Sequence, residues 1–413
     1  MARLEDLDQR VAIVGGGYAG MAAAVRLAER GVPVSVYEAG PVLGGRARRI
    51  AQRGRSLDNG QHILIGAYAE LARLMRLVGV PADALLRMPL ELRYARGFAL
   101  RALPLPAPLG LLGGLLAARG APLAERLGAL RFVLALRRSR YRMAEDCSVE
   151  TLLARHRQDG ALGKYLWRAL CVAALNTPPA RASAAAFLAV LRDALDGPRG
   201  ASDLLLPRVD LARLFPEPAA DFVAAHGGEV RLNEPVHDLA ALRRAHRAVI
   251  VAVGPHQLKH LSPELEPAVA YQPIYTCYLQ YPEHVRLPRP MLGLDEGLVQ
   301  WVFDRGALLG ERGRLACVIS AEGEHESMTH AELAAACHRE LARALAGLPQ
   351  PEWSSVIAEK RATVACEASR APIAQATRWP GVFLAGDYTD AEYPPTLEAA
   401  VRSGLRAARL AAP

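Results

Sequence analysis

The stretch VAIVGGGYAG at residues 11–20 decides the fold that this sequence predicts. Residues 11–14 are apolar throughout, as in a strand that is buried on both faces of a parallel sheet. Glycines then follow with the spacing of a tight turn from a strand into a helix, and helical spacing continues to residue 30. Residues 34–37 form a further short strand. The stretch therefore predicts a β-α-β unit of the Rossmann type.

Each glycine of this unit has a physical role in holding a dinucleotide. Gly15 permits the tight turn, Gly17 lets the backbone approach a pyrophosphate, and Gly20 lets the helix pack closely on the strand. The N-terminus of the helix offers free N–H groups and positive partial charge to the phosphates. Glu38 follows the second strand, where a carboxylate accepts hydrogen bonds from the adenosine ribose and repels a ribose phosphate. We therefore expect a dinucleotide without that phosphate.

A second glycine motif comes shortly after the second strand. Gly44, Gly45 and Arg46 stand where the chain would cross the pyrophosphate again. Arg46 would neutralise phosphate charge at this crossing, because a guanidinium forms strong hydrogen bonds with phosphate oxygens. This extension favours FAD over NAD.

A third motif lies near the other end of the chain. Gly386 and Asp387 follow an apolar run at residues 382–385, and residues 396–412 have the spacing of a helix. Together the three motifs resemble the flavoprotein superfamily of amine oxidases and carotenoid desaturases. The resemblance implies that Asp387 meets the ribityl–phosphate region of FAD and that the helix N-terminus faces the flavin. The residues predicted to bind FAD are Gly15, Gly17, Tyr18, Ala19, Gly20, Glu38, Gly44, Gly45, Arg46, Gly386, Asp387, Thr396 and Leu397.

A narrower resemblance covers residues 11–405. Several stretches resemble the bacterial squalene-associated FAD-dependent desaturases, which are understood as hydroxysqualene dehydroxylases. The stretches are Leu57–His62, Leu175–Pro179, Ala201–Arg208, Glu359–Thr363 and Ala385–Asp390. The resemblance implies reductive dehydroxylation of hydroxysqualene to squalene in squalene and hopanoid biosynthesis, with a lipophilic isoprenoid substrate. Residues 390–395 depart from the family, where a smaller turn with a glycine is expected.

The catalytic group in such a reaction is a single acid, because an allylic hydroxyl departs once it is protonated. Asp58 and His62 are the candidates, since both follow the second glycine motif closely and should lie near the flavin. The alternative is that both residues are structural, so that Asp58 caps a turn and His62 is an ordinary surface histidine. A water held by either residue is a further alternative.

Three other functions stay open on the sequence. A polyene desaturase of the carotenoid type would have the same fold and run the hydride in the opposite direction. An amine oxidase-like flavoenzyme would need an aromatic cage beside the flavin. A flavin-bearing scaffold subunit would show no turnover. No second strand–GxGxxG–helix unit occurs in the sequence, so we expect an external electron donor.

The order of the strands predicts how the chain is divided. We expect an α/β fold with a discontinuous, Rossmann-like FAD-binding domain, formed by residues 1–75, 205–260 and 370–413. An inserted α+β substrate-binding domain would comprise residues 76–204 and 261–369. The six cysteines are scattered without metal-ligand spacing, which argues against structural zinc and a disulfide framework.

The location of the protein is predicted from its hydrophobic pattern. We expect neither a signal peptide at the charged N-terminus nor a run of the ~20 apolar residues that a spanning helix needs. We therefore predict a cytoplasmic protein without a nucleic-acid partner. The net charge of +8 and the apolar but broken stretch at residues 98–118 favour peripheral contact with the inner face of the cell membrane.

Overall fold

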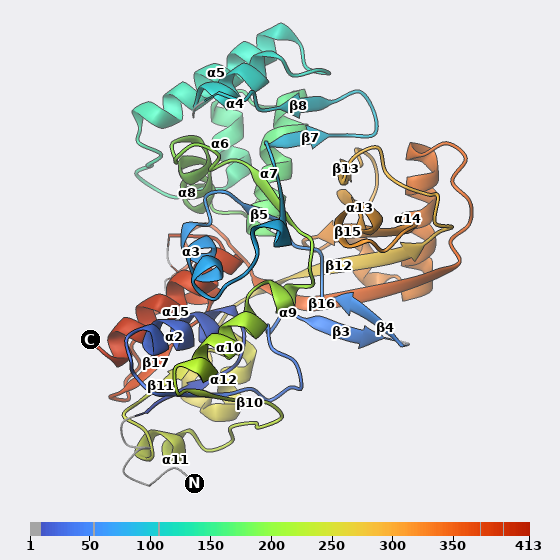
Figure 1. Ribbon diagram of the computed structural model, residues 1–413. Helices are drawn as coiled ribbons and strands as arrows, with labels where there is room; N and C mark the ends of the chain where they lie inside the picture. The colour runs from blue at the N-terminus through green and yellow to red at the C-terminus, as the bar shows by residue number, and fades with distance from the viewer. Residues whose placement is uncertain (1–9, 53, 106–107, 372, 391) are drawn as a thin grey trace.

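The computed structural model describes residues 10–52, 54–105, 108–371, 373–390 and 392–413 (Figure 1). Residues 1–9, on which the prediction about a signal peptide depends, lie outside the described residues. Within these ranges, the helices are too short or too polar to cross a membrane.

A parallel five-stranded sheet is assembled from three distant parts of the chain. In spatial order its strands are β10 (Glu229–Arg231), β2 (Val34–Tyr37), β1 (Val11–Val14), β11 (Ala248–Val251) and β17 (Val382–Leu384). All residues of β1, β2 and β11 are buried, as their apolar sequences predict for strands covered on both faces. The Rossmann-like α/β fold is therefore confirmed.

Alternate residues of these strands contact helices on opposite faces of the sheet. Val11 and Ile13 pack in the cluster that includes α2 (Tyr18–Glu29), α10 (Pro216–Ala225) and α15 (Leu397–Ala411). Ala12 and Val14 pack with α11 (Leu239–Arg244) and α12 (Pro255–Leu261). Helices α2 and α15 approach closely, because a Cβ atom on Gly404 would clash with the carbonyl oxygen of Ala19.

A second, antiparallel sheet lies beside the first. In spatial order its strands are β13 (Met291–Gly293), β14 (Trp301–Asp304), β15 (Arg314–Ser320), β12 (Tyr271–Gln280) and β16 (Trp353–Val364). Helix α14 (His330–Ala344) packs on one face, where Cys277 and Val302 are buried. The other face, with Tyr278 and Phe303, packs in the largest hydrophobic cluster of the protein.

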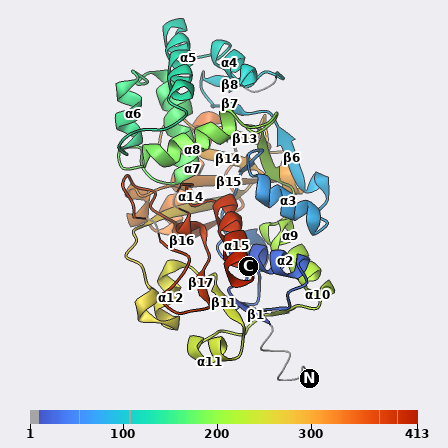
Figure 2. The same ribbon diagram turned by 90° about the vertical axis from the view of Figure 1, so that its left-hand side faces the viewer.

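That cluster joins the antiparallel sheet to a layer of helices, which Figures 1 and 2 show at the end of the molecule far from the parallel sheet. The layer contains α4 (Leu109–Leu116), α5 (Leu123–Arg138), α6 (Val149–Arg155), a π-helical turn (Gly163–Arg168), α7 (Ala169–Leu175) and α8 (Ala184–Leu195). Residues 76–204 are thus mainly helical, whereas residues 261–369 supply the antiparallel sheet. The two segments that the sequence predicts to be inserted form different structures that share one core.

Short elements connect these layers. The small sheets pair β3 (Arg49–Gln52) with β4 (Arg55–Asp58), β7 (Glu91–Arg93) with β8 (Ala99–Arg101), and β9 (Leu204–Pro207) with both β5 (Leu64–Ile65) and β6 (Leu85–Met88). The remaining α-helices of the described residues are α3 (Ala69–Leu77), α9 (Leu211–Leu214) and α13 (Arg305–Leu309). Turns of 3₁₀-helix occur at Ala82–Ala84, Pro263–Leu265, Glu324–Ser327 and Asp387–Thr389.

Candidate functional site

The glycine fingerprint has the geometry that its sequence predicts. Gly15 has a φ of +106°, and a Cβ atom there would lie 2.7 Å from the carbonyl oxygen of Ala252. A Cβ atom on Gly20 would clash with the carbonyl oxygen of Gly15. At Gly17, by contrast, a Cβ atom would meet only an ordinary contact of 3.6 Å with Gly45. The protein itself therefore leaves space at Gly17, which is where a pyrophosphate would approach.

The second glycine motif lies directly against the first. The N–H of Gly44 donates to the carbonyl oxygen of Gly16 at 2.9 Å, and Gly44 forms a parallel bridge with Gly17. Glu38 lies at the same turn, where its carboxylate accepts hydrogen bonds from Gly16 at 2.7 Å and Gly40 at 2.8 Å. The structure thus brings together the residues predicted for the pyrophosphate and the ribose.

Arg46 joins the N-terminal motifs to the C-terminal one. Its Nη2 atom lies 2.6 Å from Oδ1 of Asp387, and its Nη1 atom donates to the carbonyl oxygen of Ala362 at 2.6 Å. Asp387 is buried and follows β17 at the start of a 3₁₀ turn. Ser403 of α15 holds this turn, because its hydroxyl accepts a hydrogen bond from the N–H of Gly386 at 2.9 Å. Residues 46 and 387 are far apart in sequence but meet as one charged pair.

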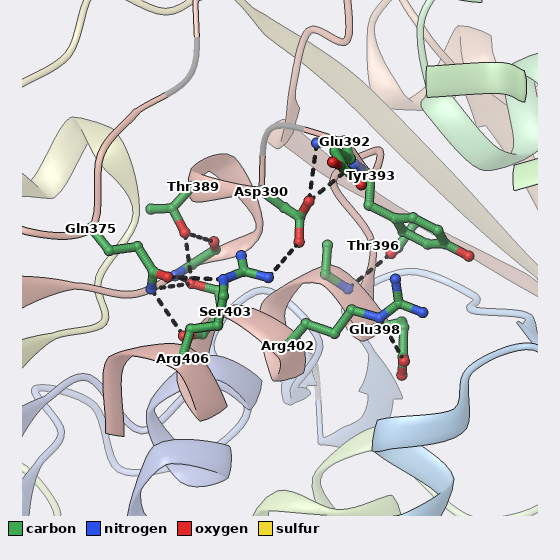
Figure 3. Close-up of polar contacts among 12 residues, drawn as sticks. Gln375, Thr389, Asp390, Glu392, Tyr393, Thr396, Glu398, Arg402, Ser403 and Arg406 are labelled. Carbon is green, nitrogen blue, oxygen red and sulfur yellow. Dashed lines mark hydrogen bonds and ion pairs between the residues drawn. The ribbon is translucent and has the colours of Figure 1, made fainter. Parts of the chain in front are cut away.

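The unusual turn after Asp387 is stabilised by its own polar network (Figure 3). Asp390 accepts hydrogen bonds from the N–H groups of Glu392 and Tyr393, at 3.1 and 3.0 Å. Its other carboxylate oxygen pairs with Arg406 of α15 at 3.0 Å, and Arg406 in turn donates to Gln375. The departure from the expected glycine turn is therefore compensated by an aspartate that caps the turn.

The start of α15 lies at the same place. Thr396 caps the helix by accepting a hydrogen bond from the N–H of Ala399 at 3.2 Å, and Leu397 is the first helical residue. Glu398 is fully buried and accepts hydrogen bonds from two N–H groups at the start of α3, at 2.9 and 3.1 Å. These contacts fix the helix so that its positive N-terminal end is held beside the turn of Asp387.

Two buried polar atoms fit a polar cofactor at this place. In the described part of the chain, two buried hydroxyl groups near these motifs have no hydrogen-bond partner, on Thr276 and Tyr388. Thr276 of β12 lies close to Gly60, and its hydroxyl would be 3.9 Å from a Cβ atom there. Buried polar groups are generally hydrogen-bonded, so these hydroxyls and the open space at Gly17 fit a ligand with phosphate, ribityl and flavin groups.

Asp58 lies at the end of β4 in a buried ionic network. Its Oδ2 atom is 3.0 Å from Nη1 of Arg305, and its Oδ1 atom accepts a hydrogen bond from the N–H of Leu211 at 3.2 Å. Burial raises the pKa of the Asp58 carboxyl, while the Arg305 guanidinium opposes that rise. Asp58 also borders a cavity of about 210 Å³ whose lining includes Arg208 and Glu311. Such a charged lining does not suit an isoprenoid chain.

Arg305 connects this network to the loop that carries His62. The guanidinium is buried, pairs with Glu311 at 2.5 Å and donates to the side chain of Gln61 at 3.2 Å. The hydroxyl of Tyr278 donates to the carbonyl oxygen of Asp58 at 2.9 Å. Arg305 and Tyr278 thus fix residues 58–61 from the antiparallel sheet and its following helix. Neither residue could be predicted from the sequence, because no motif surrounds either of them.

We expect Arg305→Met to destabilise the protein by about 3–5 kcal/mol, since it leaves the buried carboxylate of Asp58 without its counter-charge. Arg312→Met is the matched control, because Arg312 is 76% exposed and pairs with a 78% exposed Glu283. This exposed pair should contribute at most about 1 kcal/mol. Denaturant midpoints of the two holoenzyme variants provide the comparison. Equal midpoints would show that the Asp58–Arg305 pair does not stabilise the fold.

His62 lies in the same loop and is largely shielded from solvent. Burial lowers its pKa to about 4, the carbonyl of Gly60 opposes this change, and the positive charge of Arg46 adds to it. Its Nδ1 atom donates to the carbonyl oxygen of Gly60 at 3.4 Å, which leaves Nε2 as an acceptor. At neutral pH the imidazole is therefore neutral, and it can hold a water molecule but cannot donate a proton as an imidazolium.

Comparisons with known proteins agree with this geometry. The model of the family of flavin-containing amine oxidoreductases matches residues 18–412. The chain is 28% identical over 438 residues to hydroxysqualene dehydroxylase of Rhodopseudomonas palustris, with 98% of each chain covered. It is also 34% identical over 102 residues to a zeta-carotene desaturase of Zea mays, which covers 24% of this chain and 18% of the desaturase.

A solved structure shows the same fold. An oxidoreductase from Methanosarcina mazei superposes with a TM-score of 0.72 at 14% identity, covering 96% of this chain and 99% of that protein. The family match begins at Tyr18, within the glycine fingerprint, and includes the charged pair of Arg46 and Asp387 and helix α15. The chain therefore belongs to the flavin-containing amine oxidoreductase family, and it is an FAD-dependent oxidoreductase.

Proposed function

We propose that this protein removes the hydroxyl group of hydroxysqualene reductively and forms squalene, as a step of squalene and hopanoid biosynthesis. The observation that carries the proposal is the similarity to a hydroxysqualene dehydroxylase over nearly the whole of both chains. The similarity to a carotene desaturase covers only about a quarter of this chain. Residues 76–204 and 261–369 are the proposed substrate-binding segments, and the rest forms the proposed FAD-binding domain.

The chemistry of the substrate defines what the protein must supply. The hydroxyl group is allylic, so its protonation lets water leave and produces a delocalised cation. Reduced FAD supplies the hydride that such a cation accepts. The protein must hold the isoprenoid chain, exclude bulk water and place one proton at the leaving oxygen. The electrons come from an external donor, because the sequence has no second nucleotide-binding fingerprint.

We propose that His62 holds a water molecule that passes a proton to the leaving oxygen and is itself reprotonated from the solvent. The loop of His62 follows the Gly44–Arg46 crossing, and its neutral imidazole has Nε2 available as an acceptor. Asp58 is the second candidate, because burial raises the pKa of its carboxyl. Both of its oxygens already accept hydrogen bonds, which favours a positioning role in which Asp58 fixes the loop.

The proposal is tested by comparing the two directions of hydride transfer. The holoenzyme is reduced without oxygen and given hydroxysqualene, and in parallel the oxidised holoenzyme is given a more saturated polyprenoid. We expect squalene and reoxidised flavin in the first experiment, and no reaction in the second. Flavin that is reduced by the polyprenoid, with formation of a new double bond, would instead identify a desaturase. If the flavin reacts in neither experiment, the result would favour a flavin-bearing scaffold subunit without turnover.

The proposed substrate also suggests where the protein works. A long isoprenoid chain partitions into the bilayer, because each buried methylene group contributes about 0.8 kcal/mol to its transfer from water. We therefore also propose a cytoplasmic protein in peripheral contact with the inner face of the cell membrane.

A further inference from the structure

Exposed leucines gather in one region of this protein. Of the nine large hydrophobic side chains that are exposed among the described residues, seven lie between residues 103 and 134. They are Leu103, Leu105, Leu109, Leu116, Leu123, Leu127 and Leu134. Leu109 and Leu123 are 56% and 62% exposed. Single exposed leucines need no explanation, but a cluster of this kind marks an interaction site.

The exposed leucines of α5 follow helical spacing. On α5, one stripe contains Leu123, Leu127, Arg131, Leu134 and Arg138, which recur every three or four residues. The opposite side of α5 is buried in the hydrophobic core. The buried side of α5 therefore holds the helix in place, and the exposed leucines are not needed for its packing.

Helix α4 packs beside α5 and carries two more of the exposed leucines. Leu109 and Leu116 stand seven residues apart on α4, and both are exposed. Leu111 and Leu115 of the same helix are buried and hold it against the core. We define the leucine face as the seven exposed leucines on α4, α5 and the segment before α4.

The charge of the chain is concentrated around the leucine face. Residues 96–142 contain nine arginines and a single acidic residue, Glu125, so their net charge of +8 equals that of the whole chain. The rest of the chain is thus neutral by count. Arg96, Arg101 and Arg137 form ion pairs with acidic residues, whereas none of the other six has an acidic partner in the described part of the chain. The net positive charge of the protein therefore comes from this one region.

The region also has an exposed position in the fold. Figures 1 and 2 both place α4 and α5 at the end of the molecule that is remote from the parallel sheet. Contact with a broad surface at this end would leave the FAD motifs free. A flat or gently curved partner is therefore compatible with the fold.

We propose that the leucine face and its arginines dock this protein on the surface of a bilayer that contains anionic phospholipids. Exposed leucines would enter the boundary between headgroups and acyl chains, and the arginines would contact the phosphates. A nucleic acid would match the charge but not the leucines, and an acidic protein would match the charge without requiring exposed leucines on two helices. The proposed substrate gives this docking a purpose, but the docking itself is inferred from the surface alone.

Vesicle binding by the purified holoenzyme tests the proposal without any substrate, so its outcome is independent of the proposed reaction. We expect co-sedimentation with vesicles of phosphatidylcholine and phosphatidylglycerol, weaker binding to phosphatidylcholine alone, and release by salt. The double variant Arg131→Glu and Arg138→Glu should bind at least about 25-fold more weakly, since each arginine near an anionic surface contributes about fivefold.

A second variant tests the leucines. Leu109→Ser, Leu116→Ser and Leu123→Ser combined should weaken binding by at least about tenfold, because the apolar area that enters the interface is lost. The matched control is Leu232→Ser with Leu410→Ser, which changes the two exposed leucines outside the region. Arg243→Glu with Arg244→Glu on α11 is the control for charge. Unchanged flavin content and thermal unfolding would show that each variant is folded.

Three outcomes would overturn the proposal. In the first, the holoenzyme stays in solution when anionic vesicles are sedimented. In the second, the leucine and arginine variants bind these vesicles as tightly as the control variants do. In the third, the holoenzyme does not bind vesicles but forms a dimer, and the leucine substitutions abolish this dimer. That result would assign the face to contact between copies of the chain.

Discussion

Gly17→Val is expected to abolish FAD binding while the protein still folds. A valine side chain at this position would occupy the place where the pyrophosphate approaches the backbone. The protein alone tolerates a Cβ atom there, because its nearest neighbour would be Gly45 at 3.6 Å. The ratio of flavin to protein absorbance after purification should fall to background, while the circular dichroism spectrum is unchanged.

Gly31→Ala is the matched control for this substitution. Gly31 follows α2, has a φ of +72° and has no neighbour within 4 Å of an added Cβ atom. Alanine there costs roughly 1–2 kcal/mol of backbone strain but does not reach the cofactor. A Gly17→Val protein that keeps its full complement of flavin would mean that the fingerprint does not hold the pyrophosphate.

At least one of His62→Ala and Asp58→Asn is expected to lower turnover by roughly 10²–10⁴-fold, the contribution of general acid catalysis. Both variants should keep FAD, since neither side chain belongs to the phosphate-binding motifs. Turnover is measured with reduced holoenzyme and hydroxysqualene, beside the flavin content of each variant. Wild-type rates in both variants would place the acid elsewhere.

The pH profile separates the roles of the two residues. Because burial holds the pKa of His62 near 4, a water held by neutral His62 predicts no change of rate around the ordinary histidine pKa of about 6.5. If Asp58 is the acid, the rate should instead fall as the pH rises through its raised pKa, and Asp58→Asn should remove that limb. If Asp58 only positions the loop, Asp58→Asn lowers the rate without changing the profile. Asp203→Asn is a control, because Asp203 lies in another family-like stretch and pairs with Arg87.

The cofactor motifs could be predicted from the sequence because they are local. The glycines at residues 15, 17 and 20 depend on backbone conformation and close approach within a single β-α-β unit, and such constraints are visible in a short stretch. The helix predicted over residues 396–412 is observed as α15, from Leu397 to Ala411, with Thr396 as its cap. The domain boundaries and the roles of Asp58 and His62 stay predictions.

Contacts between distant segments could not be predicted in this way. Arg305 follows a strand of the antiparallel sheet, and nothing in its surrounding sequence connects it with Asp58, which lies 247 residues away. The same is true of the buried hydroxyl of Thr276, whose position beside Gly60 depends on how β12 crosses the loop. The leucine face was predicted only in part, since residues 98–118 include α4 but not α5. The periodicity of α5 alone does not show which of its faces the core covers.

The most direct test of the proposed function is a single turnover of reduced holoenzyme with hydroxysqualene in deuterated water without oxygen. Under these conditions the transferable hydrogen of reduced FAD is replaced by deuterium. We expect squalene in an amount equal to the flavin that is reoxidised, with one deuterium on the carbon that carried the hydroxyl group. Squalene without deuterium at that carbon, or flavin that stays reduced in the presence of hydroxysqualene, would contradict reductive dehydroxylation and leave only the FAD-binding fold established.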